Sequence, residues 1–261
     1  MSAGVRNIEI MQNNALKSWV DFIQETVGPQ SELIPSEAHL TLRDQDIKSF
    51  IENMLADEQN LFKIAILNFQ HYMNALNPVR KNKHRPEAWT NFVLIVLFGL
   101  IEQVVHDKYE DCYNYVKKNI KKCVDEGGTE EVLEEWRKAY GANLKVRNFF
   151  KEYISDEEKE HIIYILKQNP KFKKITSSED PIKKFIGWII ECRGYFVHGL
   201  SRNAIDESNL SVQLKNEAED EFKNEDFVWH PTLSIGQLIK FVLLGVFRRF
   251  DKGKELSIYY E

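Results

Sequence analysis

The sequence predicts an all-α protein, and three observations lead to this prediction. The 261 residues include only 12 Gly and 7 Pro, too few for the many tight turns of a β-sandwich or β-barrel. Apolar side chains recur at three- and four-residue spacing along most of the chain, which is the period of one helical face. Hydrophobic residues make up 43% and charged residues 29%, the composition of a folded chain. We therefore expect a helical bundle.

The first part of the chain is expected to form two helices. A helix predicted over residues 15–27 ends at Gly28-Pro29, where glycine can adopt positive φ and proline cannot continue the helical hydrogen bonding. An amphipathic helix is predicted over residues 45–76, with a break near Asp57. The next ten residues, 77–86, contain two prolines and four cationic side chains, which is typical of an exposed linker.

We place the domain boundary in this linker. Residues 1–80 are then an additional N-terminal helical region, and residues 81–261 form the main helical bundle. Residues 87–106 are apolar on most sides, so this helix is expected at the centre of the bundle, with Pro86 in its first turn. Its uncharged run is about half of the roughly 20 residues that a membrane span needs. We expect no membrane association.

The rest of the bundle is predicted from periodicity and capping residues. Ser155 is a good N-cap because acidic residues follow it in the first turn. The acidic stretch 203–226 is expected to hold a short hairpin or an irregular excursion. Helices are expected over residues 108–124, 129–154, 156–168, 182–198 and 235–250.

Charge and cysteine usage limit the possible classes of function. The net charge is −5, but residues 203–226 alone carry −6, so the remainder of the chain carries +1 and an RNA partner is not excluded. The three cysteines are widely spaced and no secretory signal is seen, which favours the cytoplasm. The common phosphate-loop, serine-elbow and zinc motifs do not occur, so we expect no cofactor and no metal. The cluster Glu157 to His161 is interpreted as a solvated face rather than a metal site.

One segment combines residues that could carry out chemistry on RNA. His198 is expected in the last turn of its helix, before Gly199, where the helix dipole favours the imidazolium form. Arg193 offers a fork of donors suited to a phosphate. Together they supply an acid or base and a cation for metal-free RNA cleavage. The alternative is a structural arginine that pairs with a local carboxylate such as Glu191.

The spacing of these two residues places a condition on that hypothesis. Five residues correspond to about 500° of helical rotation, so Arg193 and His198 begin about 140° apart. They could meet through the length of the arginine, through loosening of the helix at Gly194, or through a second protomer that supplies another pair.

Three segments together resemble the HEPN superfamily, particularly its Apea-like group. They are the apolar helix from Trp89 to Glu102, the motif Arg193-Gly-Tyr-Phe-Val-His198-Gly, and the closing apolar helix 238–250. The resemblance covers about residues 87–250. It implies an all-α bundle of HEPN type, usually a homodimer in which two such motifs face each other across a cleft.

The resemblance also implies an activity, that of a metal-independent endoribonuclease in stress response or defence, including toxin and antiviral roles. His198 matches the family's catalytic histidine, Arg193 the phosphate-facing arginine, and Glu102 the glutamate that orients this arginine. An antitoxin or regulatory protein is a possible further partner. Active members usually have a polar residue after the arginine, whereas this chain has Gly194. The alternatives are therefore a catalytically inactive HEPN module that binds RNA or a protein, and a helical adaptor without a nucleic-acid role.

Three basic patches are candidates for an RNA track outside the site. Each is interpreted as ordinary solvated surface unless it converges on the cleft. They comprise Arg80, Lys81, Lys83, His84 and Arg85; Lys117, Lys118, Lys121 and Lys122; and Lys171, Lys173 and Lys174.

Overall fold

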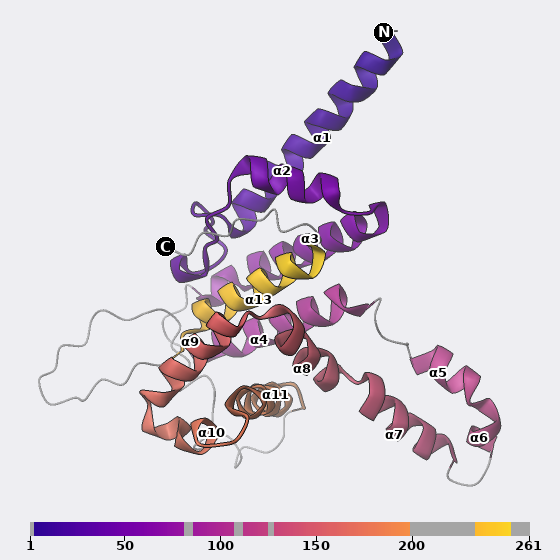
Figure 1. The fold of residues 1–261 in the computed structure, drawn as a ribbon, viewed down its shortest axis with the longest axis vertical. Coiled ribbons are helices and arrows are strands. Elements are labelled where there is room, and N and C mark those ends of the chain that lie inside the picture. The colour runs from indigo at the N-terminus through magenta and orange to yellow at the C-terminus, as the bar shows by residue number, and fades with distance from the viewer. Residues whose placement is uncertain (1–2, 81–85, 107–111, 125–127, 199–232, 252–261) are drawn as a thin grey trace, which may run out of the picture.

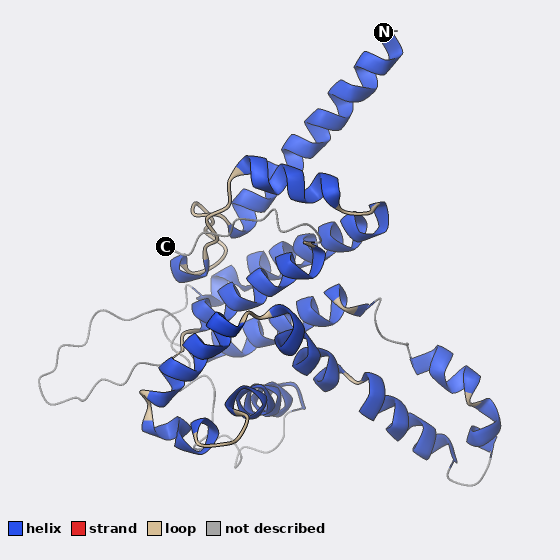
Figure 2. Cartoon of the chain, viewed as in Figure 1, coloured by secondary structure: helices blue, strands red, loops and turns tan. Residues whose placement is uncertain are grey.

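All regular elements of the described chain are helices (Figure 2), which confirms the all-α prediction. The computed structural model describes residues 3–80, 86–106, 112–124, 128–198 and 233–251. In chain order the elements are α1 (Ala3–Val27), η1 (Ser36–Ala38), α2 (Asp44–Asn53), α3 (Ala56–Arg80), α4 (Pro86–Val104), α5 (Cys112–Lys118), α6 (Ile120–Val124), α7 (Gly128–Tyr140), α8 (Ala142–Tyr153), α9 (Asp156–Lys167), η3 (Pro170–Phe172), α10 (Lys173–Thr176), α11 (Pro181–His198) and α13 (Ile235–Phe250).

The centre of the bundle is formed by α4 and α13. Helix α4 packs against α3, α8, α11 and α13, as expected for a helix that is apolar on most sides. Helix α13 has the predicted bounds and begins with a capping box. The Ser234 hydroxyl accepts from the backbone N–H of Gln237, and the Gln237 side chain accepts from the N–H of Ser234, both at 3.0 Å. Two of the free N–H groups at the buried start of α13 are thereby satisfied.

The N-terminal helix is longer than predicted, because it begins at Ala3 rather than near residue 15. Its first turns extend away from the body of the molecule (Figure 1). The helix does end before Gly28, but for a different reason from the predicted one. The φ of Gly28 is not in the left-handed region; instead, a Cβ at this position would lie 2.5 Å from the carbonyl oxygen of Gln24. A close approach of backbone, rather than a positive φ, requires this glycine.

The predicted helix over residues 45–76 is two helices, α2 and α3, separated at Met54 and Leu55. Contrary to the predicted linker, α3 continues through Pro78 to Arg80. Tertiary contacts hold this last turn in place. The Arg80 side chain donates to the carbonyl of Glu32 at 3.2 Å and lies over the Trp89 ring, 5.8 Å from its centroid. Residues 81–85 of the predicted linker lie outside the described residues.

Residues on both sides of the predicted boundary share one hydrophobic core. Helices α3 and α4, which flank the boundary, form the most extensive helix pair. Phe50 of α2 and Phe62 of α3 pack against Phe247 of α13 with ring centroids 5.3 and 5.4 Å away, and Phe62 also contacts Phe250. The division of the chain into residues 1–80 and 81–261 stays a prediction, but the two parts are packed together.

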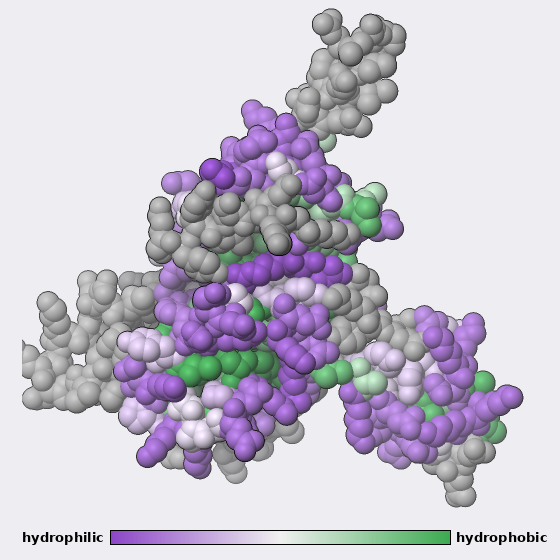
Figure 3. All heavy atoms as spheres, in the orientation of Figure 1, coloured by the Kyte–Doolittle hydropathy of each residue, from purple (hydrophilic) through white to green (hydrophobic). Residues whose placement is uncertain are grey.

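Helices α5, α6 and α7 form an arm that protrudes from the bundle (Figure 1). Two single helices were predicted here, over residues 108–124 and 129–154, and each is broken. Asn119 separates α5 from α6, and Gly141, with ψ of 156°, separates α7 from α8. On the face drawn in Figure 3, hydrophilic side chains cover most of this arm.

Helix α9 has the predicted N-cap and one unexpected feature. Ser155 forms a capping box with Glu158, which confirms the expected start of the helix. Glu158 is only 2% exposed, so the interpretation of residues 157–161 as a solvated face is wrong for this residue. Its carboxylate receives two hydrogen bonds from Arg248 of α13, at 2.6 and 2.9 Å. This bidentate pair joins two elements about 90 residues apart.

The predicted excursion over residues 203–226 lies outside the described residues. Within the described ranges, none of the helices combines the length and the apolar character that crossing a bilayer requires.

Candidate functional site

The candidate site lies where α11 passes α4. Ile186 and Ile189 form the buried stripe of α11, and Arg193 continues that stripe toward the end of the helix. On α4, Phe98 and Glu102 are one turn apart and lie on the side that α11 covers. The same amphipathic packing that holds the two helices together therefore places an arginine beside a carboxylate.

Arg193 and Glu102 form an ion pair between the two helices. The Nη2 atom of Arg193 lies 3.9 Å from Oε1 of Glu102, and the side chains are 27% and 32% exposed. The guanidinium also lies over the Phe98 ring, 5.4 Å from the ring centroid. The alternative expectation, a local pair with Glu191, is wrong, because the carboxylate beside Arg193 comes from α4. The structure thus brings together two of the three predicted site residues.

Some hydrogen-bonding atoms of this pair have no partner among the described residues. At 3.9 Å the two groups attract each other electrostatically but form no hydrogen bond. Nε of Arg193 and Oε1 of Glu102 are both buried atoms without a hydrogen-bond partner in the described part of the chain. Since buried polar atoms are nearly always hydrogen-bonded, these two are exceptions. The arginine is therefore positioned by an ion pair, and its N–H groups donate no hydrogen bond to a described residue.

Helix α11 is unbroken as far as His198, so the predicted location of this residue in the last turn is confirmed. Of the three ways in which Arg193 and His198 could meet, loosening of the helix at Gly194 does not occur, because α11 passes through that position. Position 198 is consequently about 140° around the axis from Arg193. The side chain of His198 is outside the described part of the structure. Within one chain, the two positions lie on different sides of α11.

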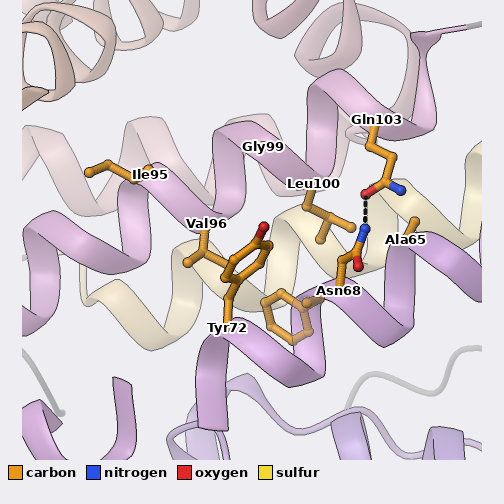
Figure 4. A pocket seen from close by; sticks show the side chains of 9 residues that line it. Ala65, Asn68, Tyr72, Ile95, Val96, Gly99, Leu100 and Gln103 are labelled. Atoms are coloured by element: carbon orange, nitrogen blue, oxygen red, sulfur yellow. Dashed lines mark hydrogen bonds between the residues drawn. The ribbon is translucent and has the colours of Figure 1, made fainter. Parts of the chain in front are cut away.

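Sequence reasoning missed a groove of about 350 Å³ between α3 and α4 (Figure 4). Asn68 of α3 donates to the Gln103 side chain across the groove at 3.3 Å. The Tyr72 ring lies along it, opposite Val96, and a Cβ at Gly99 would meet nothing within 4 Å. Helical periodicity could not reveal this groove because an exposed apolar side chain follows the same spacing as a buried one.

A second groove, of about 630 Å³, was also missed, and it collects charged side chains from three elements. Arg147 of α8, Lys174 of α10, and Lys183 and Lys184 of α11 line it together with Trp188. Only Lys174 came from a predicted basic patch. No sequence signal could join these residues, since the groove exists only once α8, α10 and α11 have packed.

Described members of the other two basic patches are held by groups outside the candidate site. The Arg80 side chain donates to the carbonyl of Glu32 and lies over the Trp89 ring, and the rest of that patch is outside the described residues. Lys122 on the arm bonds to Glu135 at 2.7 Å. In the described ranges, no cluster of three or more His, Cys, Asp or Glu side chains is arranged to hold a metal ion.

Comparisons with protein-family models, with curated proteins and with solved structures find no match to this chain.

Proposed function

We propose that this protein is a metal-independent endoribonuclease of HEPN type, acting at a cleft between two copies of the chain. The observation that supports this proposal is the Glu102–Arg193 pair. The residues are about 90 positions apart, yet α4 and α11 bring them to 3.9 Å, as the resemblance implied. A carboxylate that holds an arginine without saturating its donors is suited to a positioned phosphate-binding group.

The proposed roles follow from the charge that develops during RNA cleavage. One His198 removes the proton of a 2′-hydroxyl, whose oxygen attacks the adjacent phosphorus. The bond from phosphorus to the 5′-oxygen breaks, and a second histidine donates a proton to that leaving oxygen. Arg193 stabilises the extra negative charge on the phosphate oxygens in the transition state, while Glu102 holds the guanidinium in place. The products carry a 2′,3′-cyclic phosphate and a 5′-hydroxyl.

Two copies of the chain are part of the proposal because of the geometry of α11. This helix is continuous through Gly194, so Arg193 and position 198 lie about 140° apart in one chain. A second copy, related by twofold symmetry, supplies an Arg193 and a His198 on the opposite wall of the cleft. The groups that one helix separates can then act on one phosphate.

The second candidate function is a non-catalytic module that binds RNA at the same cleft. Two features favour it: Gly194 replaces the polar residue that is usual in active HEPN members, and Arg193 is covered on one side by Phe98. In this case Arg193 binds the phosphate but no proton transfer follows.

Cleavage of mixed RNA in EDTA tests the proposal. The purified protein is compared with His198→Ala, Arg193→Ala and Glu102→Gln, and the cyclic phosphate ends are detected on the products. Loss of a general acid or base lowers the rate by about 10²- to 10⁴-fold, so His198→Ala should be essentially inactive. Arg193→Ala should show a similar loss, and Glu102→Gln a smaller one because it acts through Arg193.

Three exposed residues of α9 provide matched controls: His161→Ala, Lys167→Ala and Glu160→Gln should cleave as the wild type does. If His198→Ala and Arg193→Ala also retain full activity, the proposed site is wrong. RNA binding without cleavage by the wild type would support the second candidate function instead.

A further inference from the structure

The groove between α8, α10 and α11 contains four cationic side chains that form no ion pair with a described carboxylate. Arg147, Lys174, Lys183 and Lys184 have no carboxylate within 4.0 Å in the described part of the chain. This differs from Arg43, Lys122 and Arg248, each of which is held by an acidic partner. Four cations from three elements therefore line one groove, and none of them forms an ion pair with a described carboxylate.

The same groove contains an aromatic side chain and an open stretch of backbone. Trp188 is half-buried; its ring contacts Phe172 edge-on at 5.0 Å, so it is held in a fixed position while it lines the groove. Next to it, a Cβ at Gly187 would meet nothing within 4 Å. A flat ligand can approach the backbone closely at this point.

Cations combined with a fixed aromatic ring are the means by which proteins hold single-stranded nucleic acid. Phosphates lie on the cations, and bases stack on the ring. Three carboxylates also line the groove, from Glu179, Asp180 and Glu191. Asp180 caps α11 by accepting from the N–H of Lys183 at 2.9 Å. With four cations and three carboxylates the groove carries a net charge of +1, and the carboxylates can accept hydrogen bonds from base amino groups and from 2′-hydroxyls.

The groove and position 198 lie on the same face of α11. Positions 187, 191, 194 and 198 fall within about 60° around the helix axis, whereas position 193 is about 120° from position 187. From Gly187 to position 198 the distance along the axis is about 16 Å. A strand held beside Trp188 can thus continue along this face toward the end of the helix.

We infer that this groove binds single-stranded RNA and guides it along α11 to His198. The guiding role rests on the proposed function, because it requires that His198 act on RNA. The binding role does not depend on the proposed function. It requires only that the four cations contact phosphates and that Trp188 contact a base.

The test measures binding of a fluorescent 2′-O-methyl RNA oligonucleotide, which keeps its phosphates and bases but lacks the hydroxyl needed for cleavage. The full-length wild type is compared with Lys174→Glu/Lys183→Glu, and dissociation constants are measured over a range of salt concentrations. We expect about a tenfold or greater loss of affinity. The dependence of log affinity on log salt should become shallower by about 1.4, since each phosphate contact on a single strand contributes about 0.7.

The matched control is Lys173→Glu/Lys167→Glu, which changes the charge equally at two exposed lysines that do not line the groove. It should bind almost as tightly as the wild type. Trp188→Phe gives a second readout: quenching of tryptophan fluorescence by the oligonucleotide should decrease in this variant, because a base no longer stacks on the indole.

Several results would overturn the inference. They are absence of binding by the wild type, an equal loss in the control pair, or equally tight binding of a duplex with no change in quenching. Failure of the proposed function looks different: the oligonucleotide still binds in the groove, but unmodified RNA is not cleaved. Conversely, if cleavage depends on His198 while the groove pair leaves both affinity and KM unchanged, the groove inference alone is wrong.

Discussion

Two arginine–glutamate pairs in this molecule have equally exposed arginines but very different surroundings. Arg248 and Arg193 are each 27% exposed, whereas their partners Glu158 and Glu102 are 2% and 32% exposed. Arg248 donates two hydrogen bonds to Glu158, at 2.6 and 2.9 Å, and a third to the carbonyl of Tyr153 at 3.0 Å. Arg193 approaches Glu102 only to 3.9 Å.

The difference between these pairs separates a structural contact from a candidate site. In the pair of α9 and α13, every oxygen of the carboxylate is occupied, and Glu158 also completes the capping box with Ser155. In the pair of α4 and α11, one buried atom on each side lacks a hydrogen-bond partner within the described residues. Arg248 is thus held by three hydrogen bonds, whereas Arg193 is held by an ion pair and the Phe98 ring.

The largest effect on stability is expected from removing Arg248 from its pair with Glu158. Arg248→Met leaves the carboxylate of Glu158 buried without its cation, so the free energy of unfolding should fall by about 3–5 kcal/mol. Urea denaturation followed by circular dichroism measures this change. The double variant Arg248→Met/Glu158→Gln should recover part of the loss, because the buried charge is then removed as well.

Glu157→Gln is the control, since it changes an exposed carboxylate next to Glu158. Its effect should stay within about 0.5 kcal/mol. A loss below about 1 kcal/mol for Arg248→Met would show that this pair contributes no more than a surface ion pair.

The second pair should contribute much less to stability. Arg193→Met and Glu102→Gln each remove one partner of a half-exposed pair without a hydrogen bond, so each should change the free energy of unfolding by less than about 1 kcal/mol. A double-mutant cycle should give a coupling energy below about 1 kcal/mol for this pair and a larger one for Glu158–Arg248. The same two variants should nevertheless impair RNA binding or cleavage.

In these two variants the free energy of unfolding should stay almost constant while RNA binding or cleavage is impaired. A coupling energy for Glu102–Arg193 as large as that for Glu158–Arg248 would contradict this prediction. The pair would then be structural, and the case for a site at α11 would be lost.

The smallest effect on stability is expected for a third, more exposed pair on the arm, Lys122 and Glu135. The hydrogen bond that Lys122 donates to Glu135 raises the pKa of Lys122 above 10.5, and burial raises the pKa of Tyr115 above 10.0. Both groups hold their protons more tightly in the folded arm than in the unfolded chain. Their stabilising contribution is therefore present at neutral pH and decreases as the pH rises beyond about 10.

Tyrosinate absorbance measures this titration, with Tyr115→Phe identifying the contribution of Tyr115. Glu135→Gln should lower the pKa of Tyr115, since a neighbouring negative charge is lost. Glu130→Gln, on the exposed side of α7, should not change it. An unchanged titration in Glu135→Gln would show that Glu135 does not act on Tyr115.

Much of the secondary structure could be predicted from local signals. The start of α9 is marked by Ser155 and the acidic residues that follow it, and the bounds of α13 by the regular apolar stripe. The errors occurred where packing overrides local preference. Helix α3 continues through Pro78 because Arg80 is anchored beyond it, and the break at Gly141 interrupts a periodicity that continues on both sides.

Only some residues of the candidate sites could be predicted, for the same reason. Arg193 is predicted from its donor chemistry and Glu102 from the resemblance to known motifs, and the fold brings the two residues together. The groove around Trp188 was not predicted, because its cations come from three elements, and no pattern in the sequence connects Arg147 with Lys174 or Lys183.

Periodicity, capping and composition act over a few neighbouring residues, so they are enough to predict the helical class, the bounds of α9, α11 and α13, and the residue types available for chemistry. Tertiary structure alone decided which carboxylate meets Arg193, which glutamate is buried, and which lysines share a groove. These outcomes depend on contacts between residues up to about 90 positions apart. Such contacts form only when the apolar stripes of separate helices pack against one another.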